Sequence, residues 1–438
     1  MDNSLKNVSA FCDKLLVGLL LATVIIVPLF FDIRLYSVFD LSKVMALYLL
    51  TIVILVVWSI AFALKHSFKF THTTLDIPIL AYIFIFIVSS AISINPIISL
   101  FGTYKRFEGL SATLCYILLF YSIVNFITTK RRVYFLIIAI VTGASISSIY
   151  GIAQHLGFDI FKWSSFEARR VFSTFGNPVF FSAYLVMTLP LAVGIFLSNS
   201  FLQKESSVPK RAHFLWIFYV LSSIIYTTFW FTNTRACFVA LIGGLTPFLF
   251  FIFKRQTNEK YKFFILVASF TLIGILFNVR YETSIVKRFV ERFTDDMRTS
   301  GNPTVSPFIK WGELQIPEIT QIHKRPWIAT KVPVTDSTFS RIFQYLTAVE
   351  IIKDYPALGI GPDTIGILYQ KNLAKVFSVQ ESDGQFHFPR QDRIHNDILD
   401  TAATRGIFGL GTYIWLLTAF GVYVGKNYRQ LSNQNKIL

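Results

Sequence analysis

Long apolar runs recur along this 438-residue sequence and constrain its fold more than any other feature. A helix needs about 20 residues to cross roughly 30 Å of hydrocarbon, and runs of that length follow one another with short polar segments between them. Aliphatic, aromatic and sulfur-containing residues make up 53% of the chain, and the mean hydropathy is +0.55. Both values exceed those of a water-soluble domain, so the sequence predicts a chain that folds within a bilayer.

The runs are apolar on every side, which favours helices over barrel strands. The lipid-facing strands of a β-barrel alternate apolar and polar residues, and these runs do not. The predicted fold class is therefore an all-α polytopic membrane protein of about ten transmembrane helices. The predicted spans cover residues 15–31, 44–64, 76–94, 110–127, 133–152, 178–198, 212–231, 236–253, 263–279 and 406–425.

Basic residues are distributed unequally between alternate loops, and this predicts the orientation. With the N-terminus inside, seventeen lysines and arginines fall on cytoplasmic segments and eight on short outer loops. Cytoplasmic loops carry such an excess, so both termini are predicted to be cytoplasmic. These loops account for the formal net charge of +16, and no nucleic-acid partner is predicted.

The spans divide the chain into three predicted regions. Residues 1–279 are expected to form a transmembrane bundle of about nine helices, and residues 406–438 a final span with a cytoplasmic tail. Between them, residues 280–405 are expected to form a large, partly helical loop subdomain on the outer side. This loop is long enough to cap the bundle.

Three features are expected inside the loop. Residues 284–298 have an amphipathic pattern suited to the membrane surface. A helix is predicted over Arg341–Tyr355, because capping residues precede it and Pro356 ends it. A last helix is expected to start near His395 and to lead into the final span.

Several arginines lie at the predicted outer ends of the spans, although most lysines and arginines of the loops are predicted to be cytoplasmic. Placing an arginine at hydrocarbon depth costs about 2.5–3.5 kcal/mol, and a single one is most simply a side chain that reaches a lipid headgroup. Four on four outer segments predict instead a cationic pocket that holds a diphosphate through bidentate hydrogen bonds. The residues assigned to this pocket are Arg106, Arg170, Arg235 and Arg341, together with Asn177 in the turn before the sixth span and Glu108, which would orient or neutralise Arg106.

His395 is the candidate general base. An isolated histidine is more often structural than catalytic, but this one lies at the edge of the predicted cationic pocket, next to the membrane. Nearby arginines would lower its pKa and favour the neutral imidazole, which can accept a proton from a sugar hydroxyl. No pair of histidines has the spacing of metal ligands, and the three cysteines are scattered singly, so neither a metal site nor a cofactor is predicted.

An ordered set of motifs resembles the O-antigen ligase superfamily, which includes O-antigen ligases, O-antigen polymerases and bacterial protein O-oligosaccharyltransferases. The resemblance spans roughly residues 100–425, and only the ordered set is specific. Members usually have further spans after the one that follows the large loop, so the acceptor-binding part stays open. The motifs are Arg106 to Leu110, Ser173 to Pro178, Thr234 to Ala236, Arg341 through Pro362, and His395-Asn396 with Gly406 and Gly409.

The resemblance implies a glycosyltransferase of the bacterial inner membrane that is independent of metal ions and has a periplasmic active site. Its donor would be a glycan linked to undecaprenyl diphosphate, and its acceptor a hydroxyl of lipid A-core, of a glycan or of a protein. Residues matching Arg235 and Arg341 would hold the diphosphate, and a residue matching His395 would activate the acceptor hydroxyl with inversion at the transferred sugar.

The residues leave other functions open. A polysaccharide polymerase would use the same donor chemistry with a growing glycan as acceptor. A transporter of lipid-linked glycans is a rival outside the enzymes, although the sequence has no paired inverted repeats and no ionisable residues at corresponding mid-span positions. A sensor whose loop binds a ligand is a third reading, and it would not require His395.

Overall fold

A computed structural model describes most of the chain. The described residues are 3–64, 70–104, 106–161, 163, 170–197, 212–254, 260–280, 337–377 and 391–430. The amphipathic segment predicted over 284–298 lies outside these residues. Within them the secondary structure is helical throughout, as the predicted all-α fold class requires.

The chain divides into two compact units, and each is described by itself. Unit 1 contains Met1–Lys69, Leu118–Pro307 and Tyr428–Leu438. Unit 2 contains Phe70–Ile117 and Phe308–Asn427. Each unit is therefore assembled from segments that lie far apart in the sequence, and helix α5 (Leu110–Phe126) begins in unit 2 and ends in unit 1.

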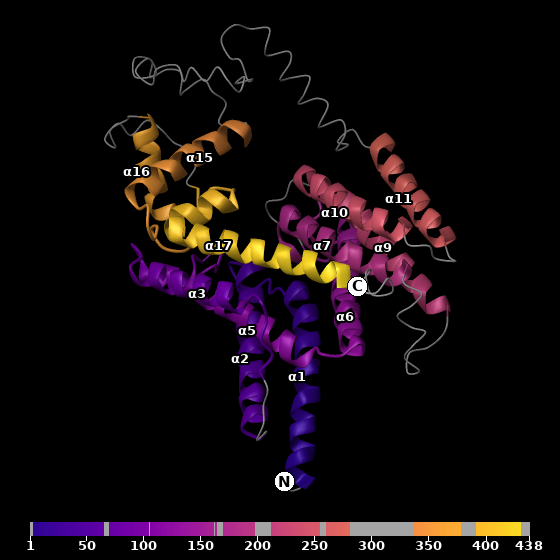
Figure 1. Cartoon of the computed structure of the whole chain (residues 1–438). Coiled ribbons are helices and arrows are strands. Elements are labelled where there is room, and N and C mark those ends of the chain that lie inside the picture. The colour runs from indigo at the N-terminus through magenta and orange to yellow at the C-terminus, as the bar shows by residue number, and fades with distance from the viewer. Residues whose placement is uncertain are drawn as a thin grey trace. The chain divides into compact units, whose positions relative to one another are not determined.

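Unit 1 is a bundle of apolar helices (Figure 1). The helix α1 packs on α2 and α6, and α9 packs on α6, α7 and α11. A large buried cluster that includes Phe181, Phe196 and Phe229 joins α6, α7 and α9 to α10 and α11. The elements are α1 (Asn3–Leu29), α2 (Asp40–Leu64), α6 (Lys130–His155), the 3₁₀ helix η1 (Ser173–Phe175), α7 (Pro178–Leu197), α9 (Ala212–Thr232), α10 (Arg235–Lys254) and α11 (Lys260–Arg280).

The C-terminal end of α1 shows how a long apolar helix is terminated. The last carbonyl groups of a helix have no partner inside the helix. The Lys43 ammonium of α2 donates to the carbonyl oxygens of Val27, Pro28 and Phe30 at 3.3, 2.7 and 3.1 Å. The Thr174 hydroxyl also donates to the Pro28 carbonyl, at 2.9 Å. Lys43 of α2 thus caps the C-terminal end of α1.

Unit 2 is built around a smaller core. Its helices α15 and α16 pack together (Figure 1). The fully buried side chains of Ala348, Ile351, Ile394 and Ala403 belong to one cluster that joins these helices to the start of α17. The elements are α3 (Asp76–Ala91), α4 (Pro96–Phe101), the first part of α5, α15 (Ser337–Asp354), α16 (Ile365–Phe377) and α17 (Asp397–Gln430).

The helix α17 breaks at Gly406, and the segment from Pro356 to Asp363 packs against the break. Gly406 has φ 66° and ψ −169°, which lies outside the helical region. The N–H of Ile360 donates to the Ala403 carbonyl at 3.1 Å, and the N–H of Ile407 donates to the Pro356 carbonyl at 2.9 Å. The backbone groups released by the break are thereby satisfied, as buried backbone groups must be.

Serines from the α3–α4 region hold the same segment from the other side. Buried Ser89 donates to the Leu358 carbonyl at 2.8 Å, Ser93 to the Ile360 carbonyl at 3.1 Å, and Ser99 to the Pro362 carbonyl at 3.0 Å. A Cβ at Gly361 would lie 1.9 Å from the Ser93 hydroxyl oxygen, so only glycine fits there. This segment is the structural centre of unit 2.

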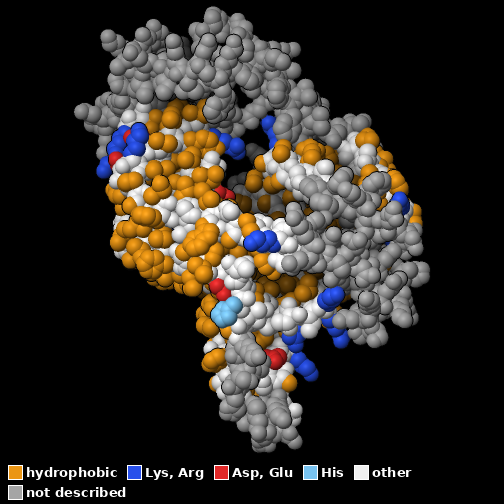
Figure 2. Space-filling model, in the orientation of Figure 1, with side chains coloured by type: hydrophobic (Ala, Val, Ile, Leu, Met, Phe, Trp, Pro, Cys, Tyr) orange, Lys and Arg blue, Asp and Glu red, His pale blue; other side chains and the backbone are white. Residues whose placement is uncertain are grey.

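Seven helices are long and apolar enough to cross a membrane, judged over the described residues. Every predicted span coincides with a helix. The apolar helices at the third, fourth and eighth spans have only 10–17 residues in the described part of the chain, so they are not among the seven. Hydrophobic side chains cover much of the surface drawn in colour in Figure 2, and many large ones are exposed, such as Leu49, Phe84 and Ile414. Such exposure suits contact with lipid. The seven are Asn7–Leu29, Asp40–Leu64, Lys130–His155, Pro178–Leu197, Leu215–Thr232, Lys260–Phe277 and Asp397–Asn427.

The predicted loop elements are confirmed where the structure describes them. A helix covers Ser337–Asp354 and ends before Pro356, and the last helix begins at Asp397, two residues after His395. The final span predicted over 406–425 lies within α17, where the candidate span is Asp397–Asn427. The division into residues 1–279, 280–405 and 406–438 by membrane position stays a prediction.

Candidate functional site

His395 lies in unit 2 between two fixed points. Ile394 is fully buried in the core. Asn396 caps α17, because its side-chain oxygen accepts the N–H groups of Ile398 and Leu399 at 3.1 and 3.2 Å. His395 itself is exposed and has a left-handed backbone, with φ 56°. The residue is thus held in a conformation that non-glycine residues seldom adopt and that often occurs at functional sites.

The electrostatic surroundings of His395 agree with the sequence-based expectation. Partial burial and the positive charge of Arg106 hold the pKa of the imidazole below its usual range, and Arg341 and Arg393 act in the same direction. The Asp392 carboxylate opposes them. A neutral imidazole is therefore favoured at neutral pH, which is the form that can accept a proton.

Arg106 forms a bidentate ion pair with Asp392. Its Nε and Nη2 atoms donate to the two carboxylate oxygens at 2.7 and 3.3 Å. The guanidinium also holds the pKa of Asp392 below its usual range, against the effect of burial. The Asp392 carboxylate therefore occupies these donors, and a substrate diphosphate would have to compete with it. Arg106 affects the pKa of His395 through its positive charge.

Glu108, predicted to orient or neutralise Arg106, pairs with a different arginine. Its carboxylate forms an ion pair with Arg393. Burial lowers the pKa of the Arg393 guanidinium, and the carboxylates of Asp397 and Asp400 partly offset this effect. Alternating acidic and basic side chains therefore continue from Arg106 to the first turn of α17.

Asp363 is a partly buried carboxylate beside the same cluster. Its Oδ2 atom accepts the N–H and the hydroxyl of Thr103 at 2.6 and 3.0 Å. Burial raises its pKa to about 6, and the neighbouring Asp392 adds to the effect. Asp363 therefore changes its charge close to neutral pH, unlike an ordinary aspartate.

Arg170, Arg235 and Asn177 lie in unit 1. The Arg170 guanidinium donates to the carbonyl oxygen of Thr232 and to the hydroxyl of Thr234, both at 3.0 Å, so it binds the turn that ends α9. Arg235 is half-buried and opens α10 directly after this turn. Asn177 caps α7 by accepting the N–H of Val179 at 2.8 Å.

The structure therefore brings the predicted residues together in two sets. Arg106, Glu108, Arg341 and His395 belong to unit 2, and Arg170, Asn177 and Arg235 belong to unit 1. The convergence of all four arginines on one pocket stays a prediction. Among the described histidine, cysteine, aspartate and glutamate side chains, no group of three or more is arranged to hold a metal ion.

Left-handed backbones mark the candidate segments in both units. Over the described part of the chain, all the non-glycine residues with positive φ lie within or directly beside the motif segments. They are Phe107, Ser173, Asn233, Asp363 and His395. Such strain is retained only where the surroundings enforce it, and here it coincides with the residues singled out from the sequence.

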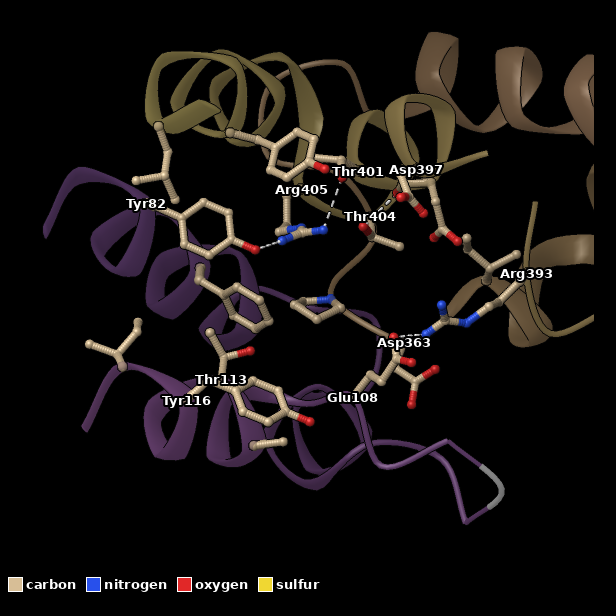
Figure 3. A pocket seen from close by; sticks show the side chains of 18 of the residues that line it. Tyr82, Glu108, Thr113, Tyr116, Asp363, Arg393, Asp397, Thr401, Thr404 and Arg405 are labelled. Carbon is tan, nitrogen blue, oxygen red and sulfur yellow. Dashed lines mark hydrogen bonds and ion pairs between the residues drawn. The ribbon is translucent and has the colours of Figure 1, made fainter. Parts of the chain in front are cut away.

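Sequence reasoning missed Asp363, Asp392, Arg393 and Arg405. Arg405 is held by the Tyr82 hydroxyl and by Thr401 Oγ1 (Figure 3). Its guanidinium also lies over the rings of Tyr82 and Phe86, 5.4 and 5.1 Å from their centres. The signal that could have found it is a charged residue directly before an apolar span, since intramembrane and boundary charges are expensive without partners.

The fold and the site define the class of this chain as a polytopic, all-α membrane protein with a charged site in unit 2. Residues 218–414 match the family model described as O-antigen ligase, and this match confirms the resemblance to the O-antigen ligase superfamily. The matched region contains Arg235, Arg341 and His395, while Arg106, Glu108, Arg170 and Asn177 precede it. A comparison with curated proteins found no match.

The family match supports a glycosyltransferase of the O-antigen ligase or polymerase type. It also implies, in general terms, a lipid-linked glycan donor and a glycan acceptor.

Proposed function

We propose that this protein transfers a glycan from undecaprenyl diphosphate to an acceptor hydroxyl on the periplasmic face of the bacterial inner membrane. The acceptor is a sugar of lipid A-core, a glycan or a protein. The proposed topology has both termini in the cytoplasm, as the basic residues of the loops suggest.

The proposed reaction forms one bond and breaks one. The acceptor oxygen attacks the anomeric carbon of the donor, and His395 takes the hydroxyl proton. The bond between the anomeric carbon and the phosphate oxygen breaks, and its electron pair leaves with the lipid diphosphate. Arg235 and Arg341 stabilise that developing negative charge, so the proposed transfer needs no metal ion. The transfer is inverting because the acceptor oxygen attacks the anomeric carbon from the face opposite the leaving diphosphate in a single displacement.

The surroundings of His395 carry the proposal. An imidazole with a lowered pKa, a left-handed backbone and a charged neighbour such as Asp392 has the properties of a general base rather than of a buried structural histidine. Nearby guanidinium groups, including that of Arg341, keep it neutral without blocking it. The family match over residues 218–414 supplies the reaction class.

The test separates the base from the diphosphate clamp. Purified full-length protein in lipid nanodiscs is assayed with a polyprenyl-diphosphate-linked glycan and rough lipopolysaccharide as acceptor. We expect His395→Ala to lower kcat by about 10²–10⁴-fold with little change in donor binding, because a base contacts the acceptor proton. We expect Arg235→Lys to weaken donor binding and to lower kcat, because lysine keeps the charge but lacks the planar fork.

A matched control is His72→Ala, which removes an exposed histidine far from His395 in the sequence. It should transfer at the wild-type rate. Near-wild-type transfer by His395→Ala would reject the base assignment. Wild-type protein that transfers no glycan to rough lipopolysaccharide, to a polymerising glycan or to a protein acceptor would reject the proposed function.

A further inference from the structure

Unit 2 contains a cavity of about 460 Å³ beside the His395 segment. All of its lining residues belong to unit 2. The chain lines it at Asp392 and Arg393 and again at Asp397, so His395 lies between two lining segments. The volume falls within the range of about 300–1,000 Å³ that is typical of small-molecule sites.

The charged groups of the cavity are unsuited to a phosphate. Five carboxylates and only two guanidinium groups line it. Both cations are already engaged, because Arg393 pairs with Glu108 and Arg405 is bound by Tyr82 and Thr401. An anionic ligand would meet an excess of negative charge.

The uncharged lining consists of three threonines, four aromatic residues and six aliphatic or proline residues. Figure 3 shows Tyr82 and Tyr116 on the two helices at one side of the cavity, opposite the first turns of α17 with Thr401 and Thr404. Phe86 and Tyr413 add further rings to the wall. A sugar ring fits such a lining, because its C–H face packs on aromatic rings and its hydroxyls donate to carboxylates.

The two arginines also retain an unused donor each. The Nε atoms of Arg393 and Arg405 are buried without a hydrogen-bond partner. Both Nε atoms are closed to solvent, so a ligand in the cavity does not reach them as the side chains stand, and the binding argument rests on the carboxylates, hydroxyls and rings of the lining.

We propose that this cavity binds the terminal sugar of the acceptor as an uncharged, polyhydroxylated ring and presents one hydroxyl to His395. The proposal rests on the proposed function, since it assigns the acceptor to a place next to the base. It also separates the acceptor from the diphosphate, which the carboxylates of the cavity repel. The carboxylates of Asp363 and Asp400 orient the ring through its hydroxyls.

The first experiment measures binding without the donor. The probes are the core oligosaccharide released from rough lipopolysaccharide with its phosphates and the same oligosaccharide after dephosphorylation. Full-length protein in nanodiscs should bind the dephosphorylated form more tightly, and Tyr116→Leu should weaken that binding by about tenfold. Tyr116→Phe keeps the ring and should retain most of the affinity.

The control is Tyr423→Leu, which removes an exposed tyrosine of α17 that does not line the cavity. It should leave binding unchanged. In the transfer assay, Tyr116→Leu should raise the acceptor KM by a similar factor and leave the donor KM and kcat close to wild type. A structural defect would instead lower kcat or change the donor KM as well.

Two results would overturn the cavity assignment. One is equal or tighter binding of the phosphorylated oligosaccharide, and the other is unchanged binding by Tyr116→Leu. Binding that follows the prediction in a protein with no transfer activity would reject the proposed function and retain the sugar site. Transfer by a protein that binds neither oligosaccharide would reject the sugar site and retain the proposed function.

Discussion

At the residue scale, the properties of His395 depend on charges that oppose one another. The guanidinium of Arg106 lowers the pKa of the imidazole, and the carboxylate of Asp392 raises it. These two groups are themselves bound to each other. The net effect on His395 therefore depends on the pair as a unit, and each member can be removed separately.

The first prediction concerns the pH dependence of transfer. Arg106→Gln removes a positive charge that favours the neutral imidazole, so the pKa of His395 should rise. A base works only when it is unprotonated, so the acidic limb of the kcat/KM profile should move to higher pH. Asp392→Asn should move the same limb to lower pH. Initial rates measured across the pH range in nanodiscs give both limbs.

Arg131→Gln is the matched control, because Arg131 is exposed at the predicted cytoplasmic end of α6. Its acidic limb should coincide with that of the wild type. An acidic limb that is unmoved in both Arg106→Gln and Asp392→Asn would show that His395 does not set the pH dependence.

At the element scale, the break in α17 decides where the charged part of the helix ends and its long apolar part begins. A Cβ at Gly406 would lie 2.1 Å from the Ala357 carbonyl oxygen, and its φ of +66° favours glycine. The break also lets the segment from Pro356 to Asp363 hydrogen-bond to the helix. This segment in turn holds Asp363 at the edge of the cavity.

The second prediction follows from this geometry. Gly406→Ala should destabilise the protein by at least about 1–3 kcal/mol, the cost of forcing a residue with a Cβ into a φ/ψ region that is essentially restricted to glycine. Steric conflict with Ala357 adds to that cost. Thermal unfolding in detergent should show a lower melting temperature, together with reduced transfer.

Gly411→Ala is the control within the same helix, because no atom lies within 4 Å of a Cβ built there. Alanine favours a helix by about 0.5–1 kcal/mol over glycine, so this variant should melt at the same temperature or higher. Equal melting temperatures for the two variants would contradict the role assigned to the break.

At the scale of the whole molecule, the proposed mechanism requires a defined orientation in the membrane. The third prediction is that the segment containing α16 is periplasmic and the loop before α6 is cytoplasmic. In a background without the three native cysteines, Lys371→Cys should react with an impermeant thiol reagent in intact cells whose outer membrane has been permeabilised. Thr128→Cys should react only after the inner membrane is also opened.

Both positions are exposed, so a difference in labelling reports the side of the membrane. The reverse pattern would place the proposed site in the cytoplasm. Such a result would contradict the proposed transfer on the periplasmic face.

The fourth prediction is that Arg235 of unit 1 and Arg341 of unit 2 share one diphosphate. Ala236 and Ile342 are exposed neighbours of these arginines. The double variant Ala236→Cys with Ile342→Cys should be joined by a short bifunctional thiol reagent, and the donor analogue undecaprenyl diphosphate should protect it. Ala236→Cys with Thr128→Cys, at the opposite predicted face, should remain unlinked. If the first pair does not link, Arg235 and Arg341 are too far apart to bind the same diphosphate, and the prediction is wrong.

The sequence by itself determined the helices and their approximate limits. In a bilayer, backbone polar groups are satisfied within a helix or between the strands of a closed barrel. Runs such as 44–64 and 133–152 are apolar on every side, which excludes barrel strands, and both are helices. The end of α15 before Pro356 and the start of α17 near His395 were also predicted from the sequence. Arg106, Arg341 and His395 were also chosen from sequence, and their charges act on one another in unit 2.

Only the tertiary structure decided which charges meet. Arg106 and Asp392 are 286 residues apart, and Thr103 and Asp363 are 260 residues apart. No local pattern encodes such pairs, because they depend on how loops between helices place side chains. The same reason explains why the sequence paired Glu108 with Arg106, whereas the fold pairs it with Arg393. Local energetics thus fixed the helices, and long-range packing fixed the chemistry around His395.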